Sequence, residues 1–493
     1  MRVVVVGAGL GGLAAALRLQ GAGHDVVVLE QRPRPGGRAY RLEDRGFTWD
    51  TGPSLITMPW VLEETFAAGG LDLGSEVDLV PLDPFYRIHW AGEERHLDFV
   101  SDRERMKAEI ARFSTRDAQR LDGFLERLRP IYEEGILGAG RRPFLRARDL
   151  AAFAPRMLAL RAMLPLWRFV AASFEHPRIR EAFSFHSMFI GGDPFRVPAI
   201  YGALVYLQFL DGVWYSRGGV YSLVEAMARP LDVRCNERVE RVEQHGGRVT
   251  GVLTAGGQRL PADIVVSNAD VLRTHELAGR RPARRALRPT MSCFLLYLGT
   301  DRPVPRLLHH TLMVGEGYRR FVADITRGAL MPTSFSTYLH APARTDPSMA
   351  PPDAESLAVL LPVPNLRAGL DWESEGDRLR DALLEDLERN FGLSGLRASV
   401  QVEHRMDPRD FARELGAVDG NAFAVEPTLQ QSAWFRPANR DRALRGLYQV
   451  GGGTHPGAGI PGVLLGAEIS AALVAQDFPA PRAGGRARAA LPA

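Results

Sequence analysis

Cysteine and lysine are both scarce in this chain of 493 residues. Its two cysteines, Cys235 and Cys293, stand far apart and in no metal-ligand spacing. This excludes a disulfide-stabilised scaffold and a cysteine-ligated zinc or iron–sulfur centre. The single lysine, Lys107, lies in a charged stretch, so Schiff-base chemistry lacks a suitable amine. We therefore expect no metal site and no covalent lysine chemistry.

Net charge and long apolar runs are also lacking. The balance of 61 Lys+Arg against 58 Asp+Glu leaves +3, too little for a nucleic-acid-binding protein. Residues 3–6 form the first apolar run and are followed at once by glycines, so we expect no secretory signal. Because the sequence shows no uncharged apolar stretch of about 18 residues, we expect no membrane-spanning helix. A cytoplasmic protein, or one on the inner face of a membrane, is the expected class.

The N-terminal thirty residues predict a strand, a turn, a helix and a second strand. Residues 3–6 are a run of valines, typical of a buried parallel strand. Residues 10–23 are rich in alanine and leucine and predict a helix. Residues 26–29 predict the next strand, which ends at Glu30. Together these segments form one βαβ unit.

A G-x-G-x-x-G motif at Gly7, Gly9 and Gly12 lies between that first strand and the helix. Gly7 permits the tight turn, Gly9 lets a pyrophosphate approach the backbone, and Gly12 lets the helix pack closely on the strand. Glu30 is placed to accept hydrogen bonds from ribose hydroxyls, which favours FAD or NAD over NADP. The pair Gly36-Gly37 with Arg38 follows directly and favours FAD, since Arg38 offers charge-assisted donors to a diphosphate.

A second glycine-rich segment lies near the other end of the chain. Residues 450–463 read VGGGTHPGAGIPGV and predict a strand entering a long Gly/Pro turn, followed by a helix over 464–476. Backbone N–H groups in such a turn can face a flat polar ring, and the helix dipole stabilises negative charge on a reduced flavin. The segment therefore predicts a discontinuous cofactor domain closed by both ends of the chain.

The middle of the chain predicts helices first and strands later. Residues 59–208 are mainly helical in pattern, and 141–180 hold nine arginines. Strand patterns follow in two groups. The first comprises 238–242, 249–254 and 264–267, with Gly-Gly turns at 246–247 and 256–257. The second comprises 292–298, 334–339 and 357–361, for which we expect one antiparallel sheet, and 379–391 predict an amphipathic helix.

Both glycine-rich ends and several internal motifs resemble bacterial-type phytoene desaturases, FAD-dependent carotenoid desaturases of the amine-oxidase-like flavoprotein superfamily. The motifs are 182–187 (AFSFHS), 191–195 (GGDPF), 212–219 (GVWYSRGG), 267–270 (SNAD) and 431–437 (QSAWFRP), with 454–463 (THPGAGIPGV) the most specific. The resemblance runs from Met1 to about residue 478.

This resemblance implies roles for individual residues. Glu30 would bind the adenosine ribose, Arg38 and the glycines, Gly37 among them, the diphosphate, and the Val239 backbone the adenine. Residues 50–54 (DTGPS) fit the family's turn near the flavin. The C-terminal turn would line the isoalloxazine ring through Gly452, Gly453, Ile460, Pro461, Gly462 and Val463.

The expected architecture is α/β: a discontinuous Rossmann-type FAD-binding domain, a substrate domain of antiparallel sheet plus helices, and a helical membrane-facing region. We place the FAD-binding domain at 1–58, 216–275 and 440–478. The substrate-binding and membrane-associating region is expected at 59–215 and 276–439, and a disordered tail at 479–493.

Desaturation removes a hydride and a proton from adjacent carbons, and the flavin takes the hydride. Because loss of hydride from an allylic carbon leaves an acidic adjacent proton, a weak base suffices. Asp149 and His455 are the candidate bases. For Asp149 the position favours a surface helix cap over a base, and His455 can equally be a turn residue held by backbone hydrogen bonds.

The expected substrate is phytoene, a C40 polyene, converted stepwise toward lycopene or neurosporene. Apolar stretches 157–174 and 183–210 would supply a tunnel and a membrane-docking face, with arginines suited to anionic lipid headgroups. Quinone or dioxygen would reoxidise the flavin. Two alternatives remain: an enzyme of the same fold with another carotenoid chemistry, such as isomerisation, and a prenyl-binding carrier without redox chemistry.

Overall fold

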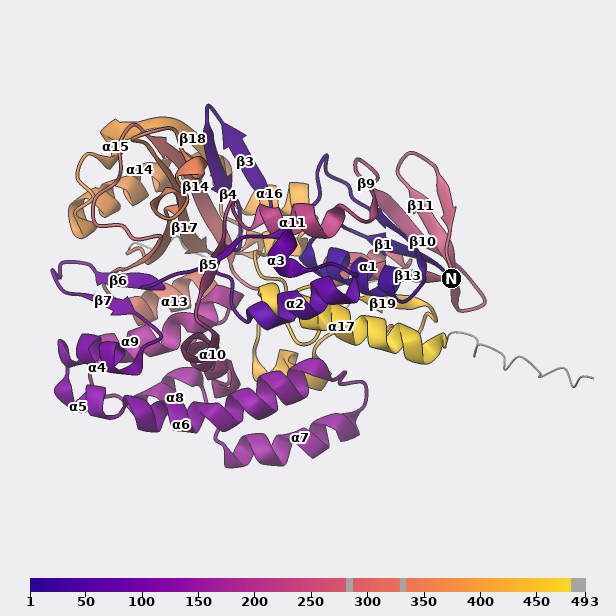
Figure 1. Ribbon diagram of the computed structural model, residues 1–493, viewed down its shortest axis with the longest axis horizontal. Coiled ribbons are helices and arrows are strands. Elements are labelled where there is room, and N and C mark those ends of the chain that lie inside the picture. Colours follow the sequence, from indigo (N-terminus) through magenta and orange to yellow (C-terminus); the bar gives the residue numbers. More distant parts are fainter. Residues whose placement is uncertain (281–286, 329–333, 480–493) are drawn as a thin grey trace, which may run out of the picture.

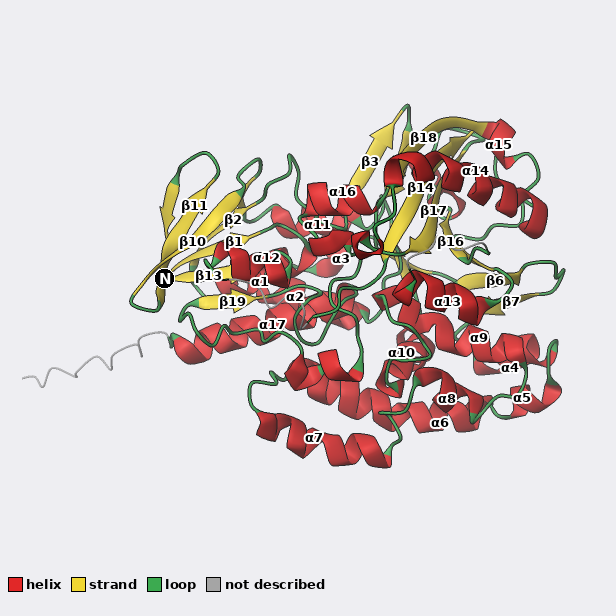
Figure 2. Ribbon diagram, turned by 180° about the vertical axis from the view of Figure 1, so that it is seen from behind, coloured by secondary structure: helices red, strands yellow, loops and turns green. Residues whose placement is uncertain are grey.

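Figure 1 shows the computed structural model of the chain, which describes residues 1–280, 287–328 and 334–479. A parallel sheet lies toward one end of the molecule and a larger mixed sheet toward the other, with a group of helices below (Figures 1 and 2). The predicted disordered tail falls outside the described residues from position 480 on.

A five-stranded parallel sheet forms around the N-terminal valines. Val3, Val4 and Val5 are at most 1% exposed, because β1 is the central strand and both of its faces are covered. Parallel pairing joins β1 to β2 on one side and to β13 on the other. In sheet order the strands are β19 (Leu447–Gln449), β13 (Ile264–Ser267), β1 (Arg2–Val6), β2 (Asp25–Leu29) and β9 (Asp232–Arg234).

Helices from the two ends of the chain pack against one another beside this sheet. Helix α1 (Leu10–Gly21) lies along α17 (Ile460–Asp477), and both contact α2 (Pro59–Ala68) (Figure 1). By length and composition α17 is the one described helix that could cross a membrane, but half of it is buried. Its leucines are used in packing within the protein.

The first group of predicted strands is divided between two sheets. Segments 238–242 and 249–254 fall in a small antiparallel sheet, and 264–267 is β13 of the parallel sheet. The strands of the small sheet are β10 (Val239–His245), β11 (Arg248–Thr254) and β12 (Arg259–Pro261). The predicted Gly-Gly turn at 246–247 joins β10 to β11, with both glycines at positive φ. Val239, Val242 and Val252 bury their side chains with those of the outer face of the parallel sheet.

The second sheet has seven strands and is mixed, whereas the sequence predicted an antiparallel one. The β15–β6 pair is parallel, and the other pairs are antiparallel. Strands β6 and β7 lie in the stretch that was predicted to be mainly helical. The sequence did not reveal them, because each strand is too short to show a clear alternation of apolar and polar residues. In sheet order the strands are β18 (Val400–Met406), β14 (Ser292–Thr300), β17 (Glu355–Val363), β16 (Thr337–His340), β15 (His310–Val314), β6 (Tyr86–Trp90) and β7 (His96–Phe99).

Most of the remaining helices cover the mixed sheet or lie below it (Figure 2). Two short sheets complete the fold, formed by β3 (Arg41–Asp44) with β4 (Phe47–Asp50) and by β5 (Leu79–Pro81) with β8 (Trp214–Ser216). The helices are α3 (Leu73–Glu76), α4 (Arg103–Ala111), α5 (Thr115–Gln119), α6 (Leu121–Tyr132), α7 (Ala147–Ala159), α8 (Leu166–Ala171), α9 (Pro177–Ser184), α10 (Ala203–Asp211), α11 (Tyr221–Ala228), α12 (Val271–Leu277), α13 (Tyr318–Arg327), α14 (Trp372–Phe391), α15 (Leu396–Ser399) and α16 (Pro408–Leu415).

The contact between α1 and α2 predicts a stability difference between two glycine substitutions. A Cβ at Gly21 would lie 2.0 Å from the Ala68 carbonyl oxygen, whereas a Cβ at Gly123 in α6 meets nothing within 4 Å. We expect Gly21→Ala to lower the free energy of unfolding by about 1–3 kcal/mol. Gly123→Ala, the control, should raise it by about 0.5–1 kcal/mol. Thermal unfolding of both variants checks this, and equal melting temperatures would contradict it.

Candidate functional site

A cavity of about 730 Å³ is lined by both ends of the chain. Twelve of the predicted cofactor-binding residues line it: Gly7, Gly9, Glu30, Gly37, Arg38, Val239, Gly452, Gly453, Ile460, Pro461, Gly462 and Val463. Segments separated by more than 400 residues therefore face one space, as a shared dinucleotide requires.

Asn268 occupies the junction between the two glycine-rich ends. A Cβ at Gly9 would lie 2.8 Å from Asn268 Nδ2, and one at Gly11 would lie 2.9 Å from Asn268 Oδ1 and 3.2 Å from the Gly451 nitrogen. Side chains at these glycines would push the segments apart. Gly12 is not a lining residue. Its Cβ would lie 2.1 Å from the Gly7 oxygen, so its role is the close packing of α1 on β1.

Glu30 lies at the carboxyl end of β2 and is 4% exposed. Its two carboxylate oxygens accept backbone hydrogen bonds from Ala8 (2.8 Å) and Arg32 (2.9 Å). These bonds fix the carboxylate beside the glycine loop and leave acceptor capacity for hydroxyl groups. The geometry fits a ribose at this end of the cavity.

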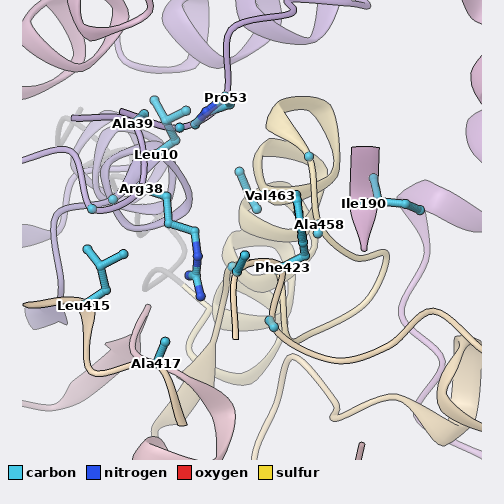
Figure 3. A pocket seen from close by; sticks show the side chains of 18 of the residues that line it. Leu10, Arg38, Ala39, Pro53, Ile190, Leu415, Ala417, Phe423, Ala458 and Val463 are labelled. Carbon is cyan, nitrogen blue, oxygen red and sulfur yellow. The ribbon is translucent and has the colours of Figure 1, made fainter. Parts of the chain in front are cut away.

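Arg38 reaches from the Leu10 and Ala39 side of the cavity toward Ala417 and Phe423 (Figure 3). Its Nη2 donates to the Asn421 carbonyl oxygen (3.2 Å) and to Asn421 Oδ1 (3.1 Å). Its buried Nε has no hydrogen-bond partner among the described residues. Burial lowers the pKa of the guanidinium from its ordinary value. A buried cation with an unused donor fits an anionic ligand, as the FAD diphosphate is.

The C-terminal turn is held by Arg436, whose role the sequence analysis missed. This residue is 3% exposed and donates to the carbonyl oxygens of Gly452 (2.6 Å), Thr454 (2.9 Å), Gln431 and Val425. These bonds tie the turn to residues 425 and 431 and fix the part of it that lines the cavity. Helix α17 then begins at Ile460, so its positive N-terminal end also faces the cavity.

Neither predicted catalytic base lines the cavity. Asp149 caps α7, where its carboxylate accepts from the Arg146 and Leu145 nitrogens, which matches the alternative interpretation as a helix cap. His455 lies 2.9 Å from the Ala139 carbonyl oxygen through Nε2 and packs against the Phe144 ring. Burial lowers the pKa of His455 to about 4. Both side chains hold local structure here, and their catalytic roles stay predictions.

The rest of the cavity wall is mainly apolar and comes from the helical region and the mixed sheet. The predicted stretch 183–210 contributes to it, whereas none of residues 157–174 is a lining residue. The apolar lining includes Phe185, Met188, Phe189, Ile190, Leu204, Leu207, Leu312, Val314, Phe321 and Leu360.

Three buried histidines near this wall were also missed by the sequence analysis. His309, His310 and His340 bring one ring nitrogen each within 4.8 Å of one another. The adjacent pair 309–310 is visible in the sequence, but His340 joins it only through strand pairing, opposite His310. Asp50 is also buried, which raises its carboxyl pKa to about 7, and it precedes cavity-lining residues 51–55.

The Arg38 geometry predicts selective loss of cofactor. Arg38→Ala should weaken FAD binding about tenfold or more, since a charge-assisted hydrogen bond contributes about 1.5–3 kcal/mol. The control is Arg34→Ala, in the same loop, whose exposed side chain pairs with Glu43. Flavin content per protein and FAD titration of the apoprotein measure the effect. An Arg38→Ala variant with full flavin content would refute the assignment.

Comparison with known proteins identifies the family and the fold. The model of the family described as flavin containing amine oxidoreductase matches residues 10–475. A redesigned triple mutant of putrescine oxidase has a similar fold, with a TM-score of 0.64 at 14% identity over 96% of this chain and 99% of that one. The predicted α/β fold with an FAD-binding sheet is confirmed.

Curated relatives are much closer in sequence. A lycopene-forming phytoene desaturase of Pseudescherichia vulneris is 42% identical over 97% of this chain and 99% of its own length. A neurosporene-forming phytoene desaturase of Rhodobacter capsulatus is 36% identical over 97% of this chain and 95% of its own length. The chain therefore belongs to the flavin containing amine oxidoreductase family and, within it, to the bacterial-type phytoene desaturases that its motifs resemble.

Proposed function

We propose that this protein is an FAD-dependent desaturase that converts phytoene stepwise to lycopene. The observation that carries the proposal is one cavity with two kinds of wall, glycine-rich around Glu30 and Arg38 and apolar along the mixed sheet. The identity with the lycopene-forming relative, 42% against 36% for the neurosporene-forming one, favours lycopene as the end product.

The residues present fit FAD, which when bound accepts the hydride from the substrate. Glu30 would hold the ribose, Arg38 and the glycine loop the diphosphate, and the Val239 backbone the adenine. The Arg436-braced turn and the start of α17 would hold the ring and stabilise negative charge on it. The apolar wall orients the polyene and excludes water.

The chain divides into a cofactor-binding and a substrate-binding part. We propose that 1–58, 216–275 and 440–478 form the FAD-binding domain, because the five parallel strands fall within these ranges. Residues 59–215 and 276–439 would bind the substrate. Their apolar lining residues include ones from η3 (Phe185–Ile190), α10, α13 and the mixed sheet.

Two alternatives predict different behaviour. A prenyl-binding carrier without redox chemistry has no use for the Arg38 donor or the braced C-terminal turn, and it would purify colourless. A carotenoid isomerase with the same fold would rearrange double bonds without net transfer of electrons. The consumption of an electron acceptor therefore separates desaturation from isomerisation.

The decisive assay is anaerobic incubation of the FAD-loaded protein with phytoene in liposomes and a quinone. We expect the polyene absorption to move to longer wavelength in steps, with about one quinone reduced for each double bond formed. A parallel assay with dioxygen in place of quinone identifies the acceptor. Products that isomerise without quinone reduction, or phytoene recovered unchanged, would reject the proposal.

A membrane-docking face is part of the proposal, since phytoene resides in lipid. Several large apolar side chains are exposed in the lower helical region: Leu137, Leu158, Leu164, Leu210, Leu429 and Phe435. Leu158 on α7 is 61% exposed, and the Arg148 side chain on the same helix is 75% exposed. Helix α7 lies at the outer edge of the molecule (Figures 1 and 2). We place this face on the inner surface of the cell membrane.

Vesicle binding tests the docking face. The protein should sediment with anionic liposomes and be released by high salt, because each arginine near the surface contributes about 1 kcal/mol. Leu158→Asp and Arg148→Ala should each reduce the bound fraction. Arg259→Ala is the control, since its exposed side chain lies on β12, in the small β10–β11–β12 sheet, which is well separated from α7 (Figure 1). Equal loss with Arg259→Ala would contradict the assigned face.

A further inference from the structure

A row of polar side chains leads away from the otherwise apolar cavity wall. Ser54 and Tyr338 both line the cavity, and the Ser54 Oγ lies 2.5 Å from the Tyr338 hydroxyl oxygen. The same hydroxyl lies 2.7 Å from His310 Nδ1. The cavity is thus connected by hydrogen bonds to a histidine that is fully buried.

Strand register explains why this row exists. Leu312 and Tyr338 face one another across β15 and β16, and both line the cavity. Residues two apart on a strand point to the same side, so His310 and His340, the next pair in register, continue that face beyond the cavity. The apolar sheet face therefore ends in a polar cluster.

From this cluster the row continues toward the surface. His340 Nε2 lies 3.1 Å from His309 Nε2, and His309 Nδ1 lies 2.7 Å from the Thr345 hydroxyl oxygen. Thr345 is partly exposed. His310 Nε2 is buried and has no hydrogen-bond partner among the described residues, and the three rings bring nitrogens within 4.8 Å of one another. Rotation of one imidazole, or a bridging water, closes that gap.

The proposed desaturation creates a need for such a row. Each new double bond breaks two C–H bonds: one hydrogen leaves with both bond electrons to the oxidised flavin, and the other leaves as a proton while its electrons form the double bond. Neither Asp149 nor His455 lines the cavity, so a route for that proton is sought among the polar residues that do. In an apolar cavity a stranded proton is costly and must be carried out.

We propose that Ser54, Tyr338 and the histidines His310, His340 and His309 form a relay that carries the substrate proton from the cavity to Thr345 at the surface. Ser54 Oγ accepts the proton while its own proton passes to Tyr338, whose hydroxyl proton passes to His310 Nδ1. His310 then releases its Nε2 proton to the neighbouring imidazole pair. Hydroxyls return to their starting state, and one proton leaves for each double bond. The inference rests on the proposed function.

Charges around the cluster are compatible with neutral, proton-accepting imidazoles. Burial lowers the pKa of His309 to about 3 and that of His310 and His340 well below the ordinary value. The Tyr215 ring lies against His309, and its hydroxyl donates to Asp346. Burial raises the pKa of the Tyr215 and Tyr338 hydroxyls, and the negative charge of Asp50 adds to both shifts. Arg217 donates to the Thr345 carbonyl oxygen. Weak bases suffice here because the proton beside a carbocation is strongly acidic.

The test follows the polyene absorption of the product in a single turnover, after anaerobic mixing of the FAD-loaded protein with phytoene vesicles. Tyr338→Phe and His310→Gln should slow product formation at least about tenfold, since positioned proton transfer contributes about 10²–10⁴-fold. Flavin content should not change. Added imidazole should restore part of the rate of His310→Gly, because it fits the space of the missing ring and can accept a proton. Ser54→Ala interrupts the proposed relay at its first residue and replaces either variant if that variant fails to fold.

Tyr86→Phe is the matched control, because its buried hydroxyl also contacts a histidine, His186 Nε2 at 2.7 Å, but does not line the cavity. Its rate of product formation should stay within about twofold of wild type. Wild-type rates in Tyr338→Phe and His310→Gln would overturn the relay, as would a slow His310→Gly variant that imidazole does not restore. Stoichiometric metal in the purified protein, lost in His310→Gln, would identify a metal site instead. If the wild type itself forms no product, the proposed function fails, independently of the relay.

Discussion

The contact of two glycine-rich segments around Asn268 is the constraint on which the rest of the structure depends. Gly9 from the N-terminal loop, Gly11 from the first turn of α1 and Gly451 from the C-terminal turn approach the Asn268 side chain so closely that none has room for a Cβ. This contact fixes α1 against α17 and places β13 between β1 and β19. The result is a cavity whose nucleotide region is lined by both glycine-rich segments.

Two buried arginines, Arg38 and Arg436, hold the glycine-rich segments in place by hydrogen bonds. Arg38 joins the second glycine pair to Asn421, which is bonded in turn to Asp270, the cap of α12. Arg436 collects four carbonyl groups from the C-terminal turn and its neighbours. Flexible segments thereby gain a fixed shape without side chains that would fill the cavity. A buried guanidinium is suited to this because it carries five donors in a rigid plane.

One face of the mixed sheet carries an apolar region that lines the cavity and a polar region formed by buried histidines. Where β15 and β16 carry Leu312 and Tyr338, the face lines the apolar cavity, and where they carry His310 and His340 it is sealed from it. A flavin enzyme acting on a hydrocarbon needs both regions, one to exclude water from the reacting carbons and one to remove the proton. On each strand the apolar and the polar region are two residues apart.

The sequence by itself determined the cofactor, the family and the local elements at both ends. This was possible because the glycine spacing, the valine runs and Glu30 act within short segments, whose local structure the sequence pattern predicts. It misjudged β6 and β7, short strands that exist because they pair with β15. The roles of Arg436 and the His309–His310–His340 cluster, and the absence of Asp149 and His455 from the cavity lining, were decided by the tertiary structure alone. These roles depend on which residues are brought together by strands and turns that are distant in the sequence. The register between two strands cannot be predicted from the local sequence pattern of either strand.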